Sequence, residues 1–189
     1  MSRRFIYIIY LIFMMVALTD FASAASGTRE DPIPIGTTAS LGDGWQLVVL
    51  SVNPDATYAI NQANQFIVKP QSGNKFVLAR IRATYFGKNS SAFAAGYKLM
   101  AIGPSSVSYS TFKNDAVRIP NAFPNTATYM SGSIEGNICW QVKSSDANSL
   151  QMYDNSVTGT HKDGLYLALY DVESRQVPQV STNHEWKYL

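Results

Sequence analysis

One long alternating segment, KFVLARIRATYFG at Lys75–Gly87, does most to limit the folds open to this chain. One set of its alternate positions is apolar, whereas the opposite set carries Arg80, Arg82 and Thr84. Successive side chains of a strand point to opposite faces of a sheet, so this period of two predicts a strand with one face in the core. The two arginines mark the other face as solvated.

Other apolar runs in the chain are short, and clusters of Gly, Pro, Asn, Asp and Ser separate them. Such spacing is typical of a sandwich or barrel. Aromatic residues, which favour strands, make up 12% of the chain. Further strands are expected at Gly44–Asn53, Tyr97–Ile102, Val107–Phe112, Gly136–Lys143, Leu150–Asp154 and Leu165–Asp171. A hairpin is expected across Gly103-Pro104. The sequence therefore predicts an all-β, antiparallel sandwich of about seven strands.

One short helix is expected between two of these strands. In DATYAINQAN, after Pro54, Asp55 can cap a helix, and Ala56 and Ile60 fall one turn apart. The pattern predicts one or two helical turns within Asp55–Asn64.

The first residues of the chain have the features of a secretory signal peptide. Arg3 and Arg4 precede an apolar segment, Phe5–Leu18, and small residues follow at Ala22 and Ala24. The apolar segment is short against the roughly 20 residues that span a bilayer. Cleavage between Ala24 and Ala25 is therefore expected, with a retained membrane anchor as the alternative.

The chain divides into a signal peptide at 1–24, one domain at 25–171 and a C-terminal extension at 172–189. Its 15 basic and 13 acidic residues are nearly balanced, which argues against nucleic acid or an anionic membrane as a partner. Cys139 is the only cysteine, so no intrachain disulfide can form and stability must come from packing. We expect a secreted, monomeric protein that is extracellular or associated with the cell envelope, and that meets the membrane only through an uncleaved signal segment.

Four short motifs carry a family resemblance. They are Gly73-Asn74-Lys75-Phe76, Tyr85-Phe86-Gly87, the Gly132–Gly136 turn and Ser145-Asp146-Ala147. In this order they resemble the telokin-like, immunoglobulin-like extracellular domains of secreted proteins and lipoproteins from Gram-positive bacteria, a family of unknown function that includes secreted immunogenic antigens. The resemblance covers roughly Gly36–Tyr170 and implies an immunoglobulin-like β-sandwich, but no reaction. The extension after Asp171 departs from the family pattern.

The sequence offers little support for an enzyme. A catalytic Cys139 needs a nearby histidine, and the chain has only His161 and His184. Cys139 lies between Ile138 and Trp140 in an expected strand, so it is interpreted as a small packing residue, with some exposure left open by its place opposite Trp140. No Cys or His cluster predicts a metal site, and no glycine-rich phosphate loop predicts a cofactor.

The favoured function is a non-enzymatic binding module for an unknown protein or cell-envelope ligand. The long connections Asn61–Asn74 and Lys113–Tyr129 are the expected recognition elements, with Phe123 and Tyr129 as candidate binding residues. The alternative is a carbohydrate or cell-wall-ligand binding module, although Trp45 and Trp140 lie on apolar strand faces that favour a core role. A hydrolase or cysteine-dependent enzyme is the third possibility.

Overall fold

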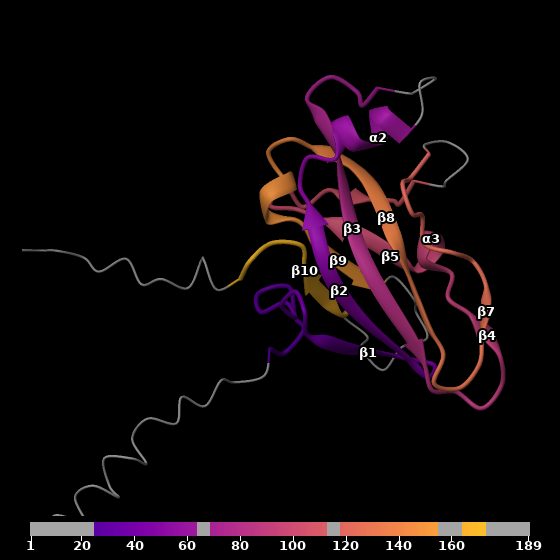
Figure 1. Ribbon diagram of the computed structural model, residues 1–189. Coiled ribbons are helices and arrows are strands. Elements are labelled where there is room, and N and C mark those ends of the chain that lie inside the picture. The colour runs from indigo at the N-terminus through magenta and orange to yellow at the C-terminus, as the bar shows by residue number, and fades with distance from the viewer. Residues whose placement is uncertain (1–24, 64–68, 113–117, 155–163, 173–189) are drawn as a thin grey trace, which may run out of the picture.

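The computed structural model describes residues 25–63, 69–112, 118–154 and 164–172 (Figure 1). The expected signal peptide, which ends at Ala24, and the C-terminal extension after Val172 lie outside these residues. Within the described part of the chain, no helix is long and apolar enough to cross a membrane.

The described strands form two antiparallel sheets that lie face to face (Figure 1). The first sheet has the order β1-β2-β3-β8, with β1 at Thr38–Gly42, β2 at Trp45–Asn53, β3 at Asn74–Tyr85 and β8 at Ser133–Lys143. The second has the order β10-β9-β5-β6, with β5 at Leu99–Ile102, β6 at Ser108–Tyr109, β9 at Gln151–Asp154 and β10 at Tyr166–Ala168. The predicted all-β sandwich is confirmed.

Smaller elements join these sheets. A two-stranded ribbon pairs β4 at Ser91–Ala92 with β7 at Ala127–Thr128. The helical segments are α2 at Thr57–Ala63, α3 at Ala95–Lys98 and the 3-10 turn η1 at Ala147–Ser149. The expected helix therefore exists, and the strand expected from Tyr97 begins only at Leu99, because α3 occupies the residues before it.

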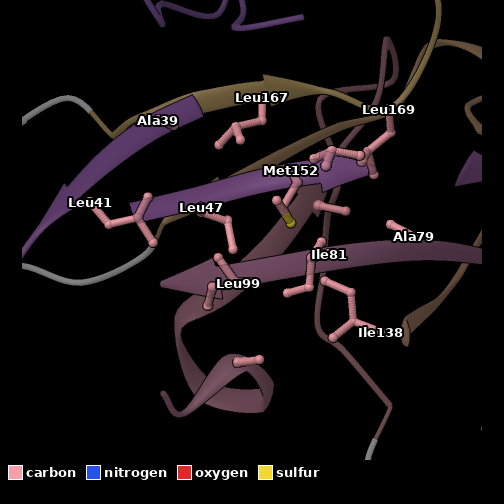
Figure 2. Packing of buried hydrophobic residues seen from close by; sticks show 14 of the residues in the cluster. Ala39, Leu41, Leu47, Ala79, Ile81, Leu99, Ile138, Met152, Leu167 and Leu169 are labelled. Atoms are coloured by element: carbon pink, nitrogen blue, oxygen red, sulfur yellow. The ribbon is translucent and has the colours of Figure 1, made fainter. Parts of the chain in front are cut away.

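Apolar side chains of both sheets meet in the main core (Figure 2). Leu47 of β2, Ile81 of β3 and Trp140 of β8 face Leu99 of β5 and Met152 of β9, and all five are at most 1% exposed. Trp45 is also buried, so the core role expected for both tryptophans is confirmed. Full burial of one such aliphatic side chain stabilises the fold by about 1.5 to 3 kcal/mol, which lets the sandwich form without a disulfide.

A second, smaller cluster covers one end of the outer face of the first sheet. Phe76 and Leu78 of β3 and Cys139 of β8 pack there against Ile60 of α2 and Ile119. The chain is anchored at this point because the Ala56 amide donates to the Phe76 carbonyl at 2.7 Å. We call these residues the outer cluster. Strand alternation left some exposure of Cys139 open. That expectation is wrong, because α2 and Ile119 form a third layer over this side chain.

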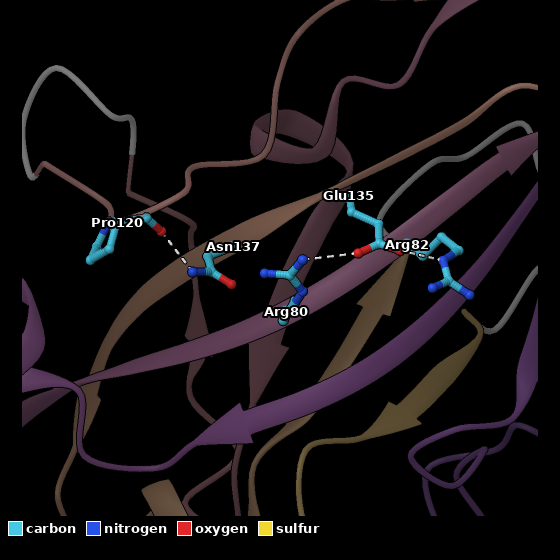
Figure 3. Close-up of polar contacts among 5 residues, drawn as sticks. All are labelled: Arg80, Arg82, Pro120, Glu135 and Asn137. Atoms are coloured by element: carbon cyan, nitrogen blue, oxygen red, sulfur yellow. Dashed lines mark hydrogen bonds and ion pairs between the residues drawn. The ribbon is translucent and has the colours of Figure 1, made fainter.

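The other end of the same outer face is open to solvent and charged. Arg80 and Arg82 donate to the two carboxylate oxygens of Glu135 at 3.0 and 2.5 Å (Figure 3). Hydrogen bonds from Arg82 and then Arg80 lower the pKa of Glu135. The solvated face predicted from the two arginines is confirmed, and its own charges are already paired.

The Tyr85-Phe86-Gly87 motif has a packing role. A Cβ atom on Gly87 would lie 2.1 Å from the Tyr85 hydroxyl oxygen, so only glycine lets this ring fold back over the chain. The Tyr85 ring in turn packs against Trp45, with 4.8 Å between ring centroids. The motif closes one end of the core.

Candidate functional site

The connection between β6 and β8 runs along the free edge of β8. Thr111 forms an antiparallel bridge with Trp140, and the Phe112 amide donates to the Cys139 carbonyl at 2.8 Å. Further along, the Phe123 amide donates to the Asn137 carbonyl at 2.9 Å. Two stretches of one connection therefore take the places of neighbouring strands and satisfy the edge of the sheet.

Gly136 lets the second stretch approach this closely. A Cβ atom at this position would lie 2.3 Å from the Cα atom of Phe123, closer than any real contact. The Asn137 side chain fixes the same stretch by donating from Nδ2 to the Pro120 carbonyl at 2.6 Å (Figure 3). The Gly132–Gly136 motif thus ends at Gly136, the residue against which the connection packs.

A pocket of about 350 Å³ remains between this connection, α3 and β8. Among the described residues its lining is mainly apolar and has no ionisable side chain: Phe93, Ala94, Ala95, Gly96, Thr111, Phe112, Ile119, Ala122, Phe123, Pro124, Asn125, Asn137 and Ile138. We call it the β8 pocket. Its volume lies within the range of small-ligand sites, which is about 300 to 1,000 Å³.

Hydrogen bonds and ring contacts hold the walls of the β8 pocket together. The Thr111 hydroxyl donates to the Gly96 carbonyl at 2.9 Å, which ties the connection to α3. Phe93 and Phe123 meet edge to face, with 5.8 Å between centroids. The pocket is therefore formed by the fold itself.

The two candidate binding residues have different surroundings. Phe123 is half-buried in the pocket wall and packs against the main core, whereas Tyr129 is 72% exposed beside Met130, which is 65% exposed. Tyr129 is therefore a surface residue, whereas Phe123 also has a packing role. Of the first connection, residues 64–68 lie outside the described residues.

Sequence reasoning did not find most of the pocket. Phe93, α3 and Ile138 are far in sequence from the expected loop, Lys113–Tyr129. Nothing in the local sequence around them indicates that they pack against it. Phe112 ends an expected strand, which gave no sign that its ring would face outward. Phe93, Phe112 and Phe123 are widely spaced along the chain, so no local pattern signals that they share a pocket.

Cys139 has no chemical activation in this structure. Its side chain is fully buried in the outer cluster, and burial raises the pKa of the thiol to about 12. Reactive thiols instead have lowered pKa values in electropositive, accessible sites. Both histidines lie outside the described residues, and no group of three metal-ligating side chains occurs within the described part.

Asp146 is a buried carboxylate with several hydrogen-bond partners. It accepts hydrogen bonds from the Ser105 hydroxyl and from the Tyr109 hydroxyl, the latter at 2.7 Å. Burial by itself raises the pKa of Asp146, but the hydrogen bonds from Ser105 and Tyr109 outweigh it and leave the pKa lowered. Ser105 in the β5–β6 turn and Tyr109 of β6 thus connect this hairpin to the turn after β8.

The two packed sheets place the chain among the β-sandwich proteins. Among solved structures it is similar to MPT63, a secreted protein of Mycobacterium tuberculosis, with a TM-score of 0.51 and 13% identity over 72% of this chain and 97% of that one. Two Bacillus subtilis proteins also match. The yjhA protein has a TM-score of 0.47 and 11% identity, over 71% of this chain and 96% of that one. The putative lipoprotein ycdA has a TM-score of 0.45 and 10% identity, over 70% and 38%. No family model matches the sequence, and no curated protein matches it significantly. At these identities the likeness concerns the fold.

Proposed function

We propose that this protein is a secreted, non-enzymatic binding module of the telokin-like, immunoglobulin-like type. It acts in the extracellular space or at the cell envelope, and it holds a protein or envelope ligand with the connection between β6 and β8. The observation that carries the proposal is the β8 pocket, a preformed hollow in whose wall lies the connection that also carries the exposed Tyr129 and Met130. The secreted structural neighbour MPT63 supports the location.

The chemistry of the β8 pocket favours binding over catalysis. General acid-base and nucleophilic catalysis need a titratable or activated group within reach of the substrate. The lining supplies backbone groups, one hydroxyl and two amides, and its hydroxyl already donates to Gly96. Such a set of groups can recognise a ligand by shape and hydrogen bonding.

One feature of the second sheet favours the carbohydrate alternative. Tyr153 of β9 and Tyr166 of β10 stack on the outer face of that sheet, with 5.5 Å between centroids and 30° between ring planes. Sugar-binding platforms use exposed aromatic faces. Here each ring is half-buried and covers part of the other, so a partner held at the β6–β8 connection remains the first choice.

The test is quantitative capture from envelope fractions with surface variants of the secreted protein. Tyr129→Ala is expected to lower capture of the principal envelope component by about tenfold or more, because exposed tyrosines often anchor interfaces. Tyr58→Ala is the matched control, since Tyr58 is 75% exposed on α2, at the opposite end of the molecule from β7 (Figure 1). The thermal midpoint of each variant is measured alongside.

Arg80→Glu combined with Arg82→Glu tests the charged face in the same assay. Capture within a few-fold of the original protein is expected, because these arginines are already paired with Glu135. Loss of capture in this double variant, with Tyr129→Ala unaffected, would move the binding site to the sheet face. Loss only on replacing Tyr153 or Tyr166, with soluble glycan as a competitor, would establish the carbohydrate alternative.

A further inference from the structure

We propose that the β8 pocket binds a small, uncharged aromatic molecule of about two fused rings. The inference rests on the proposed function, because it names the kind of ligand that the binding module takes at this site. Three properties of the pocket lead to it: the absence of charge, the volume and the arrangement of the rings in its walls.

The described lining favours an uncharged ligand. None of the lining side chains that the structure describes is ionisable, so a carboxylate, phosphate or ammonium group among them would lose hydration without gaining a counter-ion from them. Apolar surface, by contrast, gains about 25 cal/mol for each Å² removed from water. The ligand is therefore neutral.

The volume sets the size of the ligand. A dry protein cavity of about 150 Å³ is known to hold one benzene ring. The β8 pocket, at about 350 Å³, is a little more than twice as large. A fused pair of rings fits this space, whereas one ring leaves much of it empty.

The walls favour an aromatic ligand over an aliphatic one. Phe112 and Phe123 are half-buried in the lining, and Phe93, which is 1% exposed, meets Phe123 edge to face. Aromatic pairs with offset or edge-to-face geometry are more favourable than their buried area alone implies. A flat ligand between these rings can adopt such contacts on more than one side.

Polar recognition is limited to a few positions. The Asn137 Nδ2 group donates to the Pro120 carbonyl, and the Thr111 hydroxyl donates to the Gly96 carbonyl. Asn125 is exposed within the lining and is the other amide side chain there. One hydroxyl or ring N–H on the ligand therefore matches the polar groups available, and more would lack partners.

Naphthol and naphthalenesulfonate are a matched pair of probes, because they share a two-ring skeleton and differ in charge at neutral pH. Isothermal titration with the secreted protein is expected to show one saturable naphthol site with sub-millimolar affinity. Naphthalenesulfonate is expected to bind at least about tenfold more weakly, since its charge would be buried without a partner. Equal or tighter binding of the sulfonate would overturn the neutral class of ligand.

Pocket-filling variants locate the site. Ala94→Phe and Ala122→Phe each place a ring in the lining and are expected to weaken naphthol binding by about tenfold or more. Ala92→Phe is the control, because Ala92 is exposed on β4 and outside the lining. Unchanged naphthol affinity in both filling variants, or the same loss in the control, would overturn the site.

A measurement on the unaltered protein keeps the inference testable if the filling variants do not fold. Nuclear Overhauser contacts from naphthol protons are expected to reach the rings of Phe93, Phe112 and Phe123. Contacts confined to other residues, or no binding at all, would overturn the proposal. Tyr129→Ala should retain naphthol while losing the envelope partner, so failure of the ligand assignment and failure of the proposed function give different results.

Discussion

Two buried side chains, Cys139 and Asp146, show how the fold sets the chemistry of single residues. The Cys139 thiol lies among Phe76, Leu78 and Ile60, where its charged form has no stabilising partner. Asp146 lies in an equally buried place, at 1% exposed, but accepts hydrogen bonds from Ser105. The pKa of the thiol is raised and that of the carboxyl is lowered.

The raised pKa predicts an inert thiol in the native protein. With a pKa of about 12, only about one Cys139 thiol in ten thousand is ionised at pH 8. Iodoacetamide is therefore expected to leave the folded protein unmodified for hours and to label it fully in denaturant, as read by intact mass. Rapid native labelling with loss of binding would restore a nucleophilic role for Cys139.

Asp146 predicts a defined acid dependence of stability. Its folded pKa is lowered below the unfolded value of 3.8, so its hydrogen bonds contribute stability above that value and lose it as pH falls through the folded pKa. Asp146→Asn is expected to lower the free energy of unfolding by about 1 to 3 kcal/mol near neutral pH, and this deficit shrinks below about pH 4. Urea unfolding at several pH values measures the deficit.

Tyr109→Phe is the control for this behaviour. It removes one donor to Asp146 and keeps the carboxylate, so a smaller deficit with the same direction of pH dependence is expected. A deficit in Asp146→Asn that is constant from neutral pH to pH 3 would show that the ionised carboxylate is not what stabilises the turn.

At the level of elements, β8 connects the main core, the outer cluster and the candidate site. It pairs with β3 along its whole length, and its free edge carries the connection that forms the β8 pocket. Its alternate residues contribute Trp140 to the main core and Cys139 to the outer cluster. A change at the edge of β8 therefore affects the core and the candidate site together.

Gly136→Ala tests this contact between β8 and the connection. The added methyl group would overlap the backbone at Phe123, so an increase in the free energy of folding of about 1 to 3 kcal/mol and weaker naphthol binding are expected. Gly96→Ala is the matched control for stability alone, because its added methyl group would meet only the Thr111 hydroxyl, at 3.8 Å. Thermal unfolding of both variants and naphthol titration of Gly136→Ala test the prediction. Equal stability of the two variants would contradict the close approach.

At the scale of the whole molecule, a charged face and the β8 pocket are neighbours on the first sheet. Arg80, Arg82 and Glu135 lie on the outer face of that sheet, and Arg80 is directly opposite Asn137 of the pocket lining. Charged side chains on an open sheet face oppose association with other sheets. The binding site proposed at the β6–β8 connection is therefore at the edge of the sheet and not on this face.

The N-terminal segment, which lies outside the described residues, gives a prediction at the same scale. Intact-mass measurement on culture supernatant is expected to show a chain that begins at Ala25 or within one residue of it, because a short apolar segment followed by small residues is processed as a signal peptide. A cell-bound protein that retains Phe5–Leu18 would establish the anchor instead.

The sequence by itself determined the fold class, the position of the long strands and α2, and which face of β3 meets water. These follow from local periodicity, since alternation over a few residues fixes which side chains can share a face. It also identified the β6–β8 connection as a long irregular segment. It did not indicate β1, whose short TASLG run has a weak pattern, or α3, which follows from contacts around it.

Only the tertiary structure decided the surroundings of Cys139 and the existence of the β8 pocket. Alternation placed Cys139 opposite Trp140, but α2 and Ile119, distant in sequence, turn that outer position into a buried one. Phe93, Phe112 and Phe123 likewise meet around one hollow because the connection returns to the edge of β8 at Gly136. Periodicity describes the neighbours of a residue along the chain, whereas burial and a pocket depend on which distant segments pack against it.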